Sequence, residues 1–155
     1  MWKAMVCGAM AAMLLGLGMT AALADDKEAV IKHRRDVMKR QGEDFKVIQA
    51  YTKGEADQAA AQEKVNDLLT IAPQILDLFP AGTSLADFPG KTGAKPAIWT
   101  EWGKFKDLPA MLQAQEMKLA DAIKGGDKAA VLPQLVAVGK DACGGCHTPY
   151  REKLE

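Results

Sequence analysis

The sequence predicts an all-α fold, an antiparallel up-down bundle of four helices, and three observations support this prediction. Four long segments carry apolar residues at helical spacing, and they span about 26–52, 55–79, 97–124 and 127–154. No segment shows the apolar–polar alternation of a convincing β-strand. All connections but one are short, which places successive helices antiparallel to each other.

The first 24 residues have the pattern of a cleaved signal peptide. Lys3 supplies a positive charge, a mostly apolar stretch follows, and Ala22-Leu23-Ala24 forms an A-x-A cleavage site. The apolar stretch is short for a membrane span, and no stop-transfer pattern follows it. We therefore predict one domain over 25–155, exported to the periplasm and without a membrane anchor. Cys7 belongs to the removed segment.

The first helix of the domain, about 26–52, has one apolar face and one charged face. Arg34 lies near the centre of the apolar face, one helical turn before Met38. Either its stem lies on the core while the guanidinium reaches water, or the guanidinium meets a carboxylate inside the fold. The residues expected on this face are Val30, Arg34, Val37, Met38, Gln41, Phe45 and Ile48.

The middle helices are joined by a Gly- and Pro-rich loop over 80–96, the only long connection. Pro73 and Pro109 predict kinks, because each removes a backbone donor from a helix. We interpret Trp99 and Trp102 as core residues, since aromatic residues at helical spacing usually pack there. The expected buried stripes comprise Val65, Leu68, Leu69, Ala72, Leu76 and Phe79, then Ile98, Trp102, Phe105, Leu112, Leu119 and Ile123.

The last helix carries the motif Cys143-Gly144-Gly145-Cys146-His147, which reads C-x-x-C-H, the attachment signature of c-type haem. Two thiols one turn apart can each form a thioether with a porphyrin vinyl group, and the histidine that follows is an axial iron ligand. A redox dithiol would require a βαβ pattern, and a zinc site would require more ligands than His33. We therefore predict one covalent haem c, held by two thioethers, with His147 on the iron.

The motif lies on the predicted core-facing stripe of this helix, which comprises Leu132, Leu135, Val136, Gly139, Cys143, Cys146, His147, Tyr150 and Leu154. Pro149 should perturb the helix near Gly145, one turn earlier.

The whole chain after the signal segment resembles the class II c-type cytochromes, the group of cytochrome c-prime and cytochrome c-556. The motifs that carry the resemblance agree in order and spacing, with the haem motif near the C-terminus. They are Arg34-x-x-x-Met38-Lys39, Gly42-Glu43, Lys53-Gly54-Glu55, Leu78-Phe79-Pro80, Ile98-Trp99, Cys143 to His147, and Tyr150-Arg151.

The resemblance implies that Cys143 and Cys146 carry the thioethers and that His147 is the proximal ligand. It places Met38 on the opposite side of the iron. In cytochrome c-556-like members a methionine there binds the iron, whereas in cytochrome c-prime a Leu, Phe or Met there blocks the site without binding. Arg34 resembles the cytochrome c-prime pattern and would face a haem propionate. Arg151 lies either near the proximal side of the haem or in solvent.

These features favour a periplasmic one-electron carrier with Met38 as sixth iron ligand and with periplasmic redox proteins as partners. The alternative is a five-coordinate cytochrome c-prime that binds NO or CO. We expect no enzymatic activity, because the sequence offers no nucleophile–base pair or proton relay. A net charge of zero favours neither nucleic acid nor an anionic membrane. His33 lies at the edge of the apolar face and is not expected to bind iron. A homodimer through the first two helices stays open.

Overall fold

A computed structural model describes the backbone of residues 17–154 and the side chains of 26–154. Most of the predicted signal segment lies outside these residues. No helix in the described part of the chain is long and apolar enough to cross a membrane.

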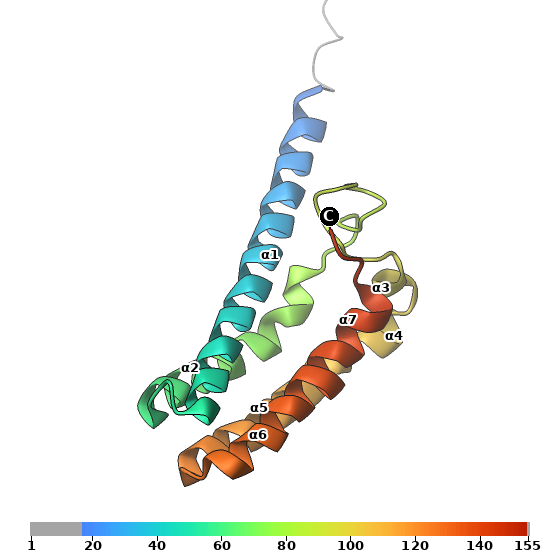
Figure 1. The fold of residues 1–155 in the computed structure, drawn as a ribbon. Helices are drawn as coiled ribbons and strands as arrows, with labels where there is room; N and C mark the ends of the chain where they lie inside the picture. The colour runs from blue at the N-terminus through green and yellow to red at the C-terminus, as the bar shows by residue number, and fades with distance from the viewer. Residues whose placement is uncertain (1–16, 155) are drawn as a thin grey trace, which may run out of the picture.

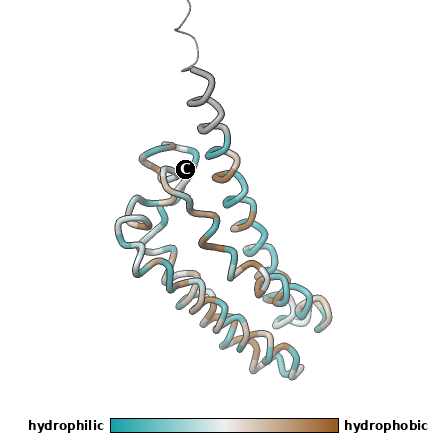
Figure 2. Tube along the Cα trace, turned by 180° about the vertical axis from the view of Figure 1, so that it is seen from behind, coloured by the Kyte–Doolittle hydropathy of each residue, from teal (hydrophilic) through white to brown (hydrophobic). Residues whose placement is uncertain are grey.

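Four helical arms form the predicted antiparallel bundle, which confirms the fold class (Figure 1). The first two arms are α1 (Leu17–Lys53) and α2 (Gln58–Ile71), the third is α5 (Leu108–Gly125), and the fourth begins with α6 (Lys128–Ala137). α1 packs against α2 and α6, and α5 packs against the same two helices. The four arms therefore close around one core, and hydrophobic and hydrophilic residues alternate along each of them (Figure 2).

The short connections are built from glycines and aspartate caps. Gly54 and Gly126 have φ of 84° and 78°, a left-handed conformation that ends α1 and α5. The Asp57 side chain then accepts a hydrogen bond from the backbone nitrogen of Ala60, and Asp127 accepts one from Ala129. These caps satisfy free N–H groups in the first turns of α2 and α6.

The middle of the chain is less regular than predicted. α2 continues as a 3-10 helix, η1 (Ala72–Leu78), and Pro73 lies at its start. The single helix expected over 97–124 is split into α3 (Ala97–Thr100), α4 (Trp102–Phe105) and α5. Pro109 begins α5 instead of kinking a longer helix, because a first-turn residue needs no intrahelical N–H bond.

The fourth arm has three parts. After α6 the chain forms a π-helix, η2 (Val138–Cys143), and then α7 (Gly144–Tyr150). The predicted helix to 154 is wrong, because Arg151 is extended and pairs with Ala94. The predicted stripe is also rotated: Leu132 and Val136 are exposed. The residues buried in α6 and η2 are Val131, Leu135, Val138 and Ala142.

Candidate functional site

A cavity of about 700 Å³ lies at the end of the bundle where the chain also terminates. Its size is within the range of small-molecule and cofactor sites. α1 contributes Arg34, Met38 and Phe45 to its wall, and the fourth arm contributes the C-x-x-C-H motif. Phe79, Phe105 and Tyr150 form an aromatic section in which Phe105 contacts both neighbours edge-on.

The two cysteines of the motif line this cavity and form no disulfide. Cys143 is the last residue of η2, and Cys146 lies in α7, so the thiols are nearly one turn apart. Both are half-buried, and burial raises the pKa of each thiol to about 11. They are therefore protonated at neutral pH, and each lies beside an apolar volume where a covalent partner can fit.

His147 follows on the same helix and also lines the cavity. Burial lowers the pKa of its imidazole, and the positive charge of Arg151 lowers it further. A neutral imidazole offers a nitrogen lone pair, which is the form that binds a metal ion. The environment of His147 therefore favours ligation over protonation.

On the α1 wall, Met38 is half-buried and its thioether sulfur is close to an amide donor. Gln41 Nε2 lies 3.6 Å from Met38 Sδ and donates to it. His33 is exposed and is not part of the cavity wall. In the described part of α1, Met38 is thus the one side chain at this wall with a donor atom of the kind that binds iron.

Arg34 is held in a cradle that the sequence did not suggest. Arg34 is 4% exposed, which excludes the first of the two alternatives for it, that the guanidinium reaches water. The guanidinium donates to Leu78 O at 3.0 Å, to Thr83 Oγ1 and O at 3.1 and 2.8 Å, and to Thr92 Oγ1 at 2.8 Å. It also stacks on Phe79, 4.7 Å from the ring centre.

All of these acceptors are neutral, and no acidic side chain pairs with Arg34 among the described residues. Burial lowers its pKa to about 10, so it stays charged at neutral pH. In the sequence, Thr83 and Thr92 of the long loop are the polar residues that could have indicated a partner for Arg34.

The C-terminal tail closes the cavity by pairing with that loop. Glu152 N donates to Gly93 O at 2.8 Å, and Lys95 N donates to Tyr150 O at 3.0 Å. Arg151 lies at this edge. It is exposed to solvent and also lines the cavity, so both positions considered for it, in solvent and near the haem site, apply. The tail and the loop therefore form one rim of the site.

The predicted core tryptophans do not belong to the cavity wall. Trp99 Nε1 donates to Phe79 O at 3.1 Å, which supports the aromatic section from behind. Trp102 is 37% exposed, with its ring tilted by 35° against Phe105, so the prediction that it is a core residue is wrong.

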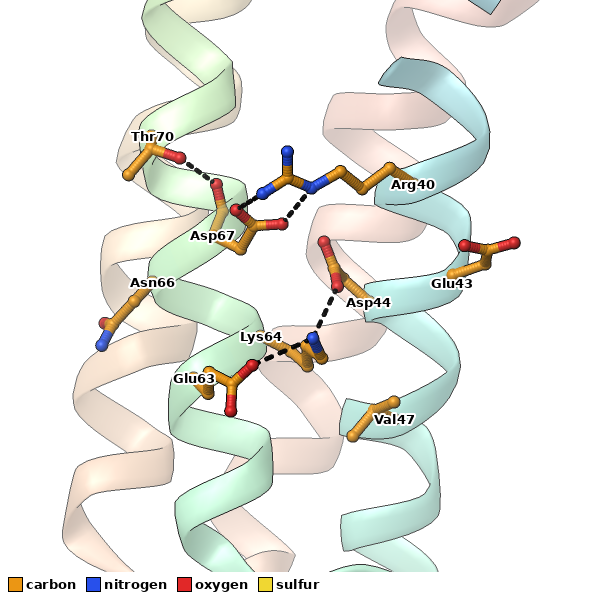
Figure 3. A pocket seen from close by; sticks show the side chains of 9 residues that line it. All are labelled: Arg40, Glu43, Asp44, Val47, Glu63, Lys64, Asn66, Asp67 and Thr70. Atoms are coloured by element: carbon orange, nitrogen blue, oxygen red, sulfur yellow. Dashed lines mark hydrogen bonds and ion pairs between the residues drawn. The ribbon is translucent and has the colours of Figure 1, made fainter. Parts of the chain in front are cut away.

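A second, smaller pocket of about 440 Å³ lies between α1 and α2 and is lined by charged side chains (Figure 3). Arg40 forms a two-point ion pair with Asp67, and Lys64 lies 3.7 Å from Asp44 Oδ1 and 3.1 Å from Glu63 Oε1. Asp44 is 3% exposed, although the sequence pattern places it on neither face of α1. Arg40 and Lys64 therefore offset most of the acidic charge here, while Asp44 Oδ2 has no hydrogen-bond partner among the described residues.

The residues around the large cavity fit a covalently attached haem. Two free thiols, a neutral imidazole and a buried cation without an anionic partner surround an apolar volume of suitable size. No group of three or more His, Cys, Asp or Glu side chains suited to a metal ion occurs in the described part of the chain. The fold and the site define the class of c-type haem proteins built on a four-helix bundle.

The chain belongs to the cytochrome c-prime family, whose profile, described as Cytochrome C', matches residues 29–151. A cytochrome c' of Rhodopseudomonas palustris is 34% identical over 142 residues, covering 90% of each chain. A cytochrome c-556 of Agrobacterium tumefaciens is 31% identical over 125 residues, covering 79% of this chain and 97% of the relative.

Solved structures agree with this assignment. A cytochrome c' from Rhodobacter superposes with a TM-score of 0.73 and 30% identity, covering 82% of this chain and 98% of the other. The nitric oxide complex of a variant cytochrome c prime from Alcaligenes xylosoxidans has a TM-score of 0.69 and 27% identity, covering 82% and 97%. The family implies a covalent haem c, and its members are generally not enzymes.

Proposed function

We propose that this protein is a periplasmic cytochrome whose single haem c binds a small neutral gas, NO or CO, at an iron face that the chain leaves open. The observation that carries the proposal is the α1 wall of the cavity. Its one soft donor, the Met38 sulfur, already accepts a hydrogen bond from Gln41, and its neighbour Phe45 is apolar. The similarity to a cytochrome c prime solved with nitric oxide supports the same reading.

In this proposal Cys143 and Cys146 hold the haem through thioethers, and His147 is the axial ligand on the α7 side. The bound haem supplies an iron centre that changes between ferric and ferrous and accepts a diatomic ligand. The family match begins at residue 29, after the predicted signal peptide.

Arg34 is proposed to neutralise a haem propionate. Its charge is buried, lines the cavity and is surrounded by neutral acceptors, so an additional anion would find an uncompensated positive charge there. The threonine cradle fixes the guanidinium plane before the haem arrives. Arg34 is therefore a preformed contact and not a flexible one.

The apolar wall accounts for selectivity towards neutral diatomics. Phe45, Leu112 and Ile98 surround the volume, and a ligand entering it must give up its water. NO and CO lose little hydration free energy on such a transfer, whereas charged or strongly hydrated ligands lose much more. We infer a binding protein and not an enzyme, because Cys143, Cys146 and His147 are taken up by the haem and members of the family are generally not enzymes.

A second candidate function is electron transfer with Met38 as sixth iron ligand. Two observations favour it: Met38 lines the cavity, and relatives named cytochrome c-556 match most of the chain. This candidate requires the sulfur to exchange its contact with Gln41 for the iron.

Absorption spectra of the purified holoprotein separate the two functions. Ferric and ferrous spectra are recorded with and without CO for the wild type, for Met38→Ala and for Met111→Ala, a control methionine that is 59% exposed. The proposal predicts a high-spin spectrum that CO shifts and that neither substitution changes. A low-spin spectrum with a sulfur–iron charge-transfer band, lost only in Met38→Ala, would establish the electron carrier instead.

A further inference from the structure

Glu116 is a buried acid that the proposed function does not use. It lies on α5 between Leu112 and Leu119, at the position of a core residue, and is 0% exposed. Neither of its carboxylate oxygens has a hydrogen-bond partner among the described residues. Burying an ionised carboxylate without a hydrogen-bond partner is unfavourable, so the environment favours the neutral form.

The position of Glu116 connects it to the haem cavity. Leu112, one helical turn before it, lines the cavity, and η2 packs against α5 on the side that leads to Cys143. The carboxylate is close enough to raise the pKa of the Cys143 thiol. Glu116 thus lies one helical turn beyond a cavity-lining residue and near Cys143.

The surroundings of Glu116 contain few other charges. The core residues that α2, η1 and α6 contribute are apolar, namely Ala61, Val65, Leu68, Ile71, Ala72, Ile75, Leu78, Val131 and Leu135. From η2 the buried residues Val138 and Ala142 are also apolar, and Cys143 is the titratable group. Burial alone raises the pKa of Glu116 to about 7. The group is therefore near its midpoint at neutral pH.

We propose that Glu116 takes up a proton when the haem in this cavity is reduced, so that electron gain and proton gain are linked in this protein. The inference rests on the proposed haem site. As one electron from a reductant enters the haem, the Glu116 carboxylate accepts one proton from solvent and forms one O–H bond. No other bond changes.

The reason is electrostatic. A ferric haem core carries one positive charge more than a ferrous core, and in a low-dielectric interior this charge stabilises a nearby carboxylate. Reduction removes that charge and leaves the carboxylate buried without compensation. The pKa of Glu116 is therefore higher in the ferrous protein, and the midpoint potential falls as pH rises between the two pKa values. Since the haem-free value is about 7, this window lies at and below neutral pH.

Spectroelectrochemical titration of the holoprotein from pH 5 to pH 9 tests the proposal. At one fixed applied potential, the ferrous-to-ferric ratio of the wild type should fall several-fold across the window. The upper limit is tenfold per pH unit, or about 59 mV for a one-electron couple. Glu116→Gln should remove this dependence. Asp44→Asn is the matched control: Asp44 is 3% exposed with a pKa of about 6, but it lies in the α1–α2 pocket. It should leave the dependence intact.

Infrared redox difference spectra provide a readout that needs no variant to fold. The ferrous-minus-ferric spectrum of the wild type should contain a C=O band of a protonated carboxyl group, and Glu116→Gln should lack it. A wild type without this band, or a variant that keeps the wild-type pH dependence, would overturn the inference while leaving the haem site standing. A protein that holds no haem would overturn the proposed function as well.

Discussion

Two hollows flank α1, and they differ in how their charges are compensated. The α1–α2 pocket is lined by acids and bases that pair with one another (Figure 3). The cavity next to α7 contains free thiols, a neutral imidazole and a buried arginine that contacts only neutral acceptors. In the first hollow most charges have a partner within the chain, and one oxygen, Asp44 Oδ2, is buried without a hydrogen-bond partner among the described residues. The second holds groups whose partners the chain itself does not supply.

This contrast shows that unpaired functional groups identify the binding site better than the presence of a pocket alone does. Exposed or half-exposed ion pairs such as Arg40 with Asp67 contribute little to stability and leave no unsatisfied group. A fully desolvated cation such as Arg34 depends on its partners, so a substitution at Arg34 or at its partners should change the stability of the protein strongly. Substitutions at the cavity should therefore change haem attachment or stability strongly, whereas substitutions at the self-paired surface charges should change stability little.

The largest effect is expected from removing both thiols of the cavity. Cys143→Ala combined with Cys146→Ala should abolish covalent haem attachment, because no other thiol is available in the described part of the chain. Haem-stained denaturing gels and acid–acetone extraction measure this loss. Lys64→Met, in the self-compensated pocket, should retain full covalent haem. Haem that stays bound to the double variant after denaturation would contradict the assignment of the thioethers.

The second effect compares two arginines of α1. Arg34→Met should lower the free energy of unfolding by about 3 kcal/mol, because it leaves Leu78 O, Thr83 O and Thr83 Oγ1 without a donor. Arg40→Met should cost much less, because the Arg40 guanidinium is exposed and water screens its ion pair with Asp67. Denaturant titration of both holoproteins decides the matter. Equal losses would show that the threonine cradle contributes nothing special.

The arginines also show what sequence reasoning can reach. Helical spacing places Arg34 and Met38 on the inner face of α1, and the two thiols and the imidazole of the motif do line one cavity. The cradle of Arg34 could not be found in this way, because Thr83 and Thr92 lie in an irregular loop whose path has no period. Local patterns predict faces of helices, and the folding of a loop over such a face depends on distant contacts.

Helix continuity is the weaker part of the sequence prediction. The pattern predicts a kink at Pro109, yet proline also starts helices, and the pattern alone does not separate the two cases. The π-helix before Cys143 has no reliable sequence signal, and a stripe drawn with regular α-helical spacing therefore includes Leu132 and Val136, which are exposed. Helical spacing assigns Asp44 to neither face, although its burial against α2 is nearly complete.

The third effect concerns the rim of the cavity. A Cβ atom at Gly93 would clash with Glu152 O, a backbone atom that cannot move aside cheaply. Gly93→Ala should therefore separate the C-terminal tail from the loop and lower the free energy of unfolding by about 1–3 kcal/mol. Gly103→Ala is the control, because nothing lies within 4 Å of its Cβ position. Hydrogen exchange at the amide of Glu152 should speed up only in the Gly93→Ala variant; unchanged protection there would mean that the pairing of tail and loop tolerates the methyl group.

The smallest effect tests whether the α1–α2 pocket is as well compensated as its ion pairs indicate. Burial, together with the nearby Asp67 carboxylate, raises the pKa of Asp44 from 3.8 to about 6 in the folded protein. Between these two values the folded state binds more protons than the unfolded state, so the free energy of unfolding falls as pH rises from about 4 to about 6. Asp44→Asn removes this slope.

Above pH 6 the Asp44→Asn variant should be more stable than the wild type by about 1 kcal/mol, because no second carboxylate is then ionised beside Asp67. Thermal unfolding at pH 4.5 and pH 7.5 measures the change, with Glu63→Gln as the control on the exposed rim of the same pocket. A wild type that gains stability over this range would mean that Lys64 and Arg40 dominate the pocket and keep Asp44 ionised. Unlike the cavity beside α7, this pocket would then have no proton-binding group at all near neutral pH, and its stability would depend on salt instead.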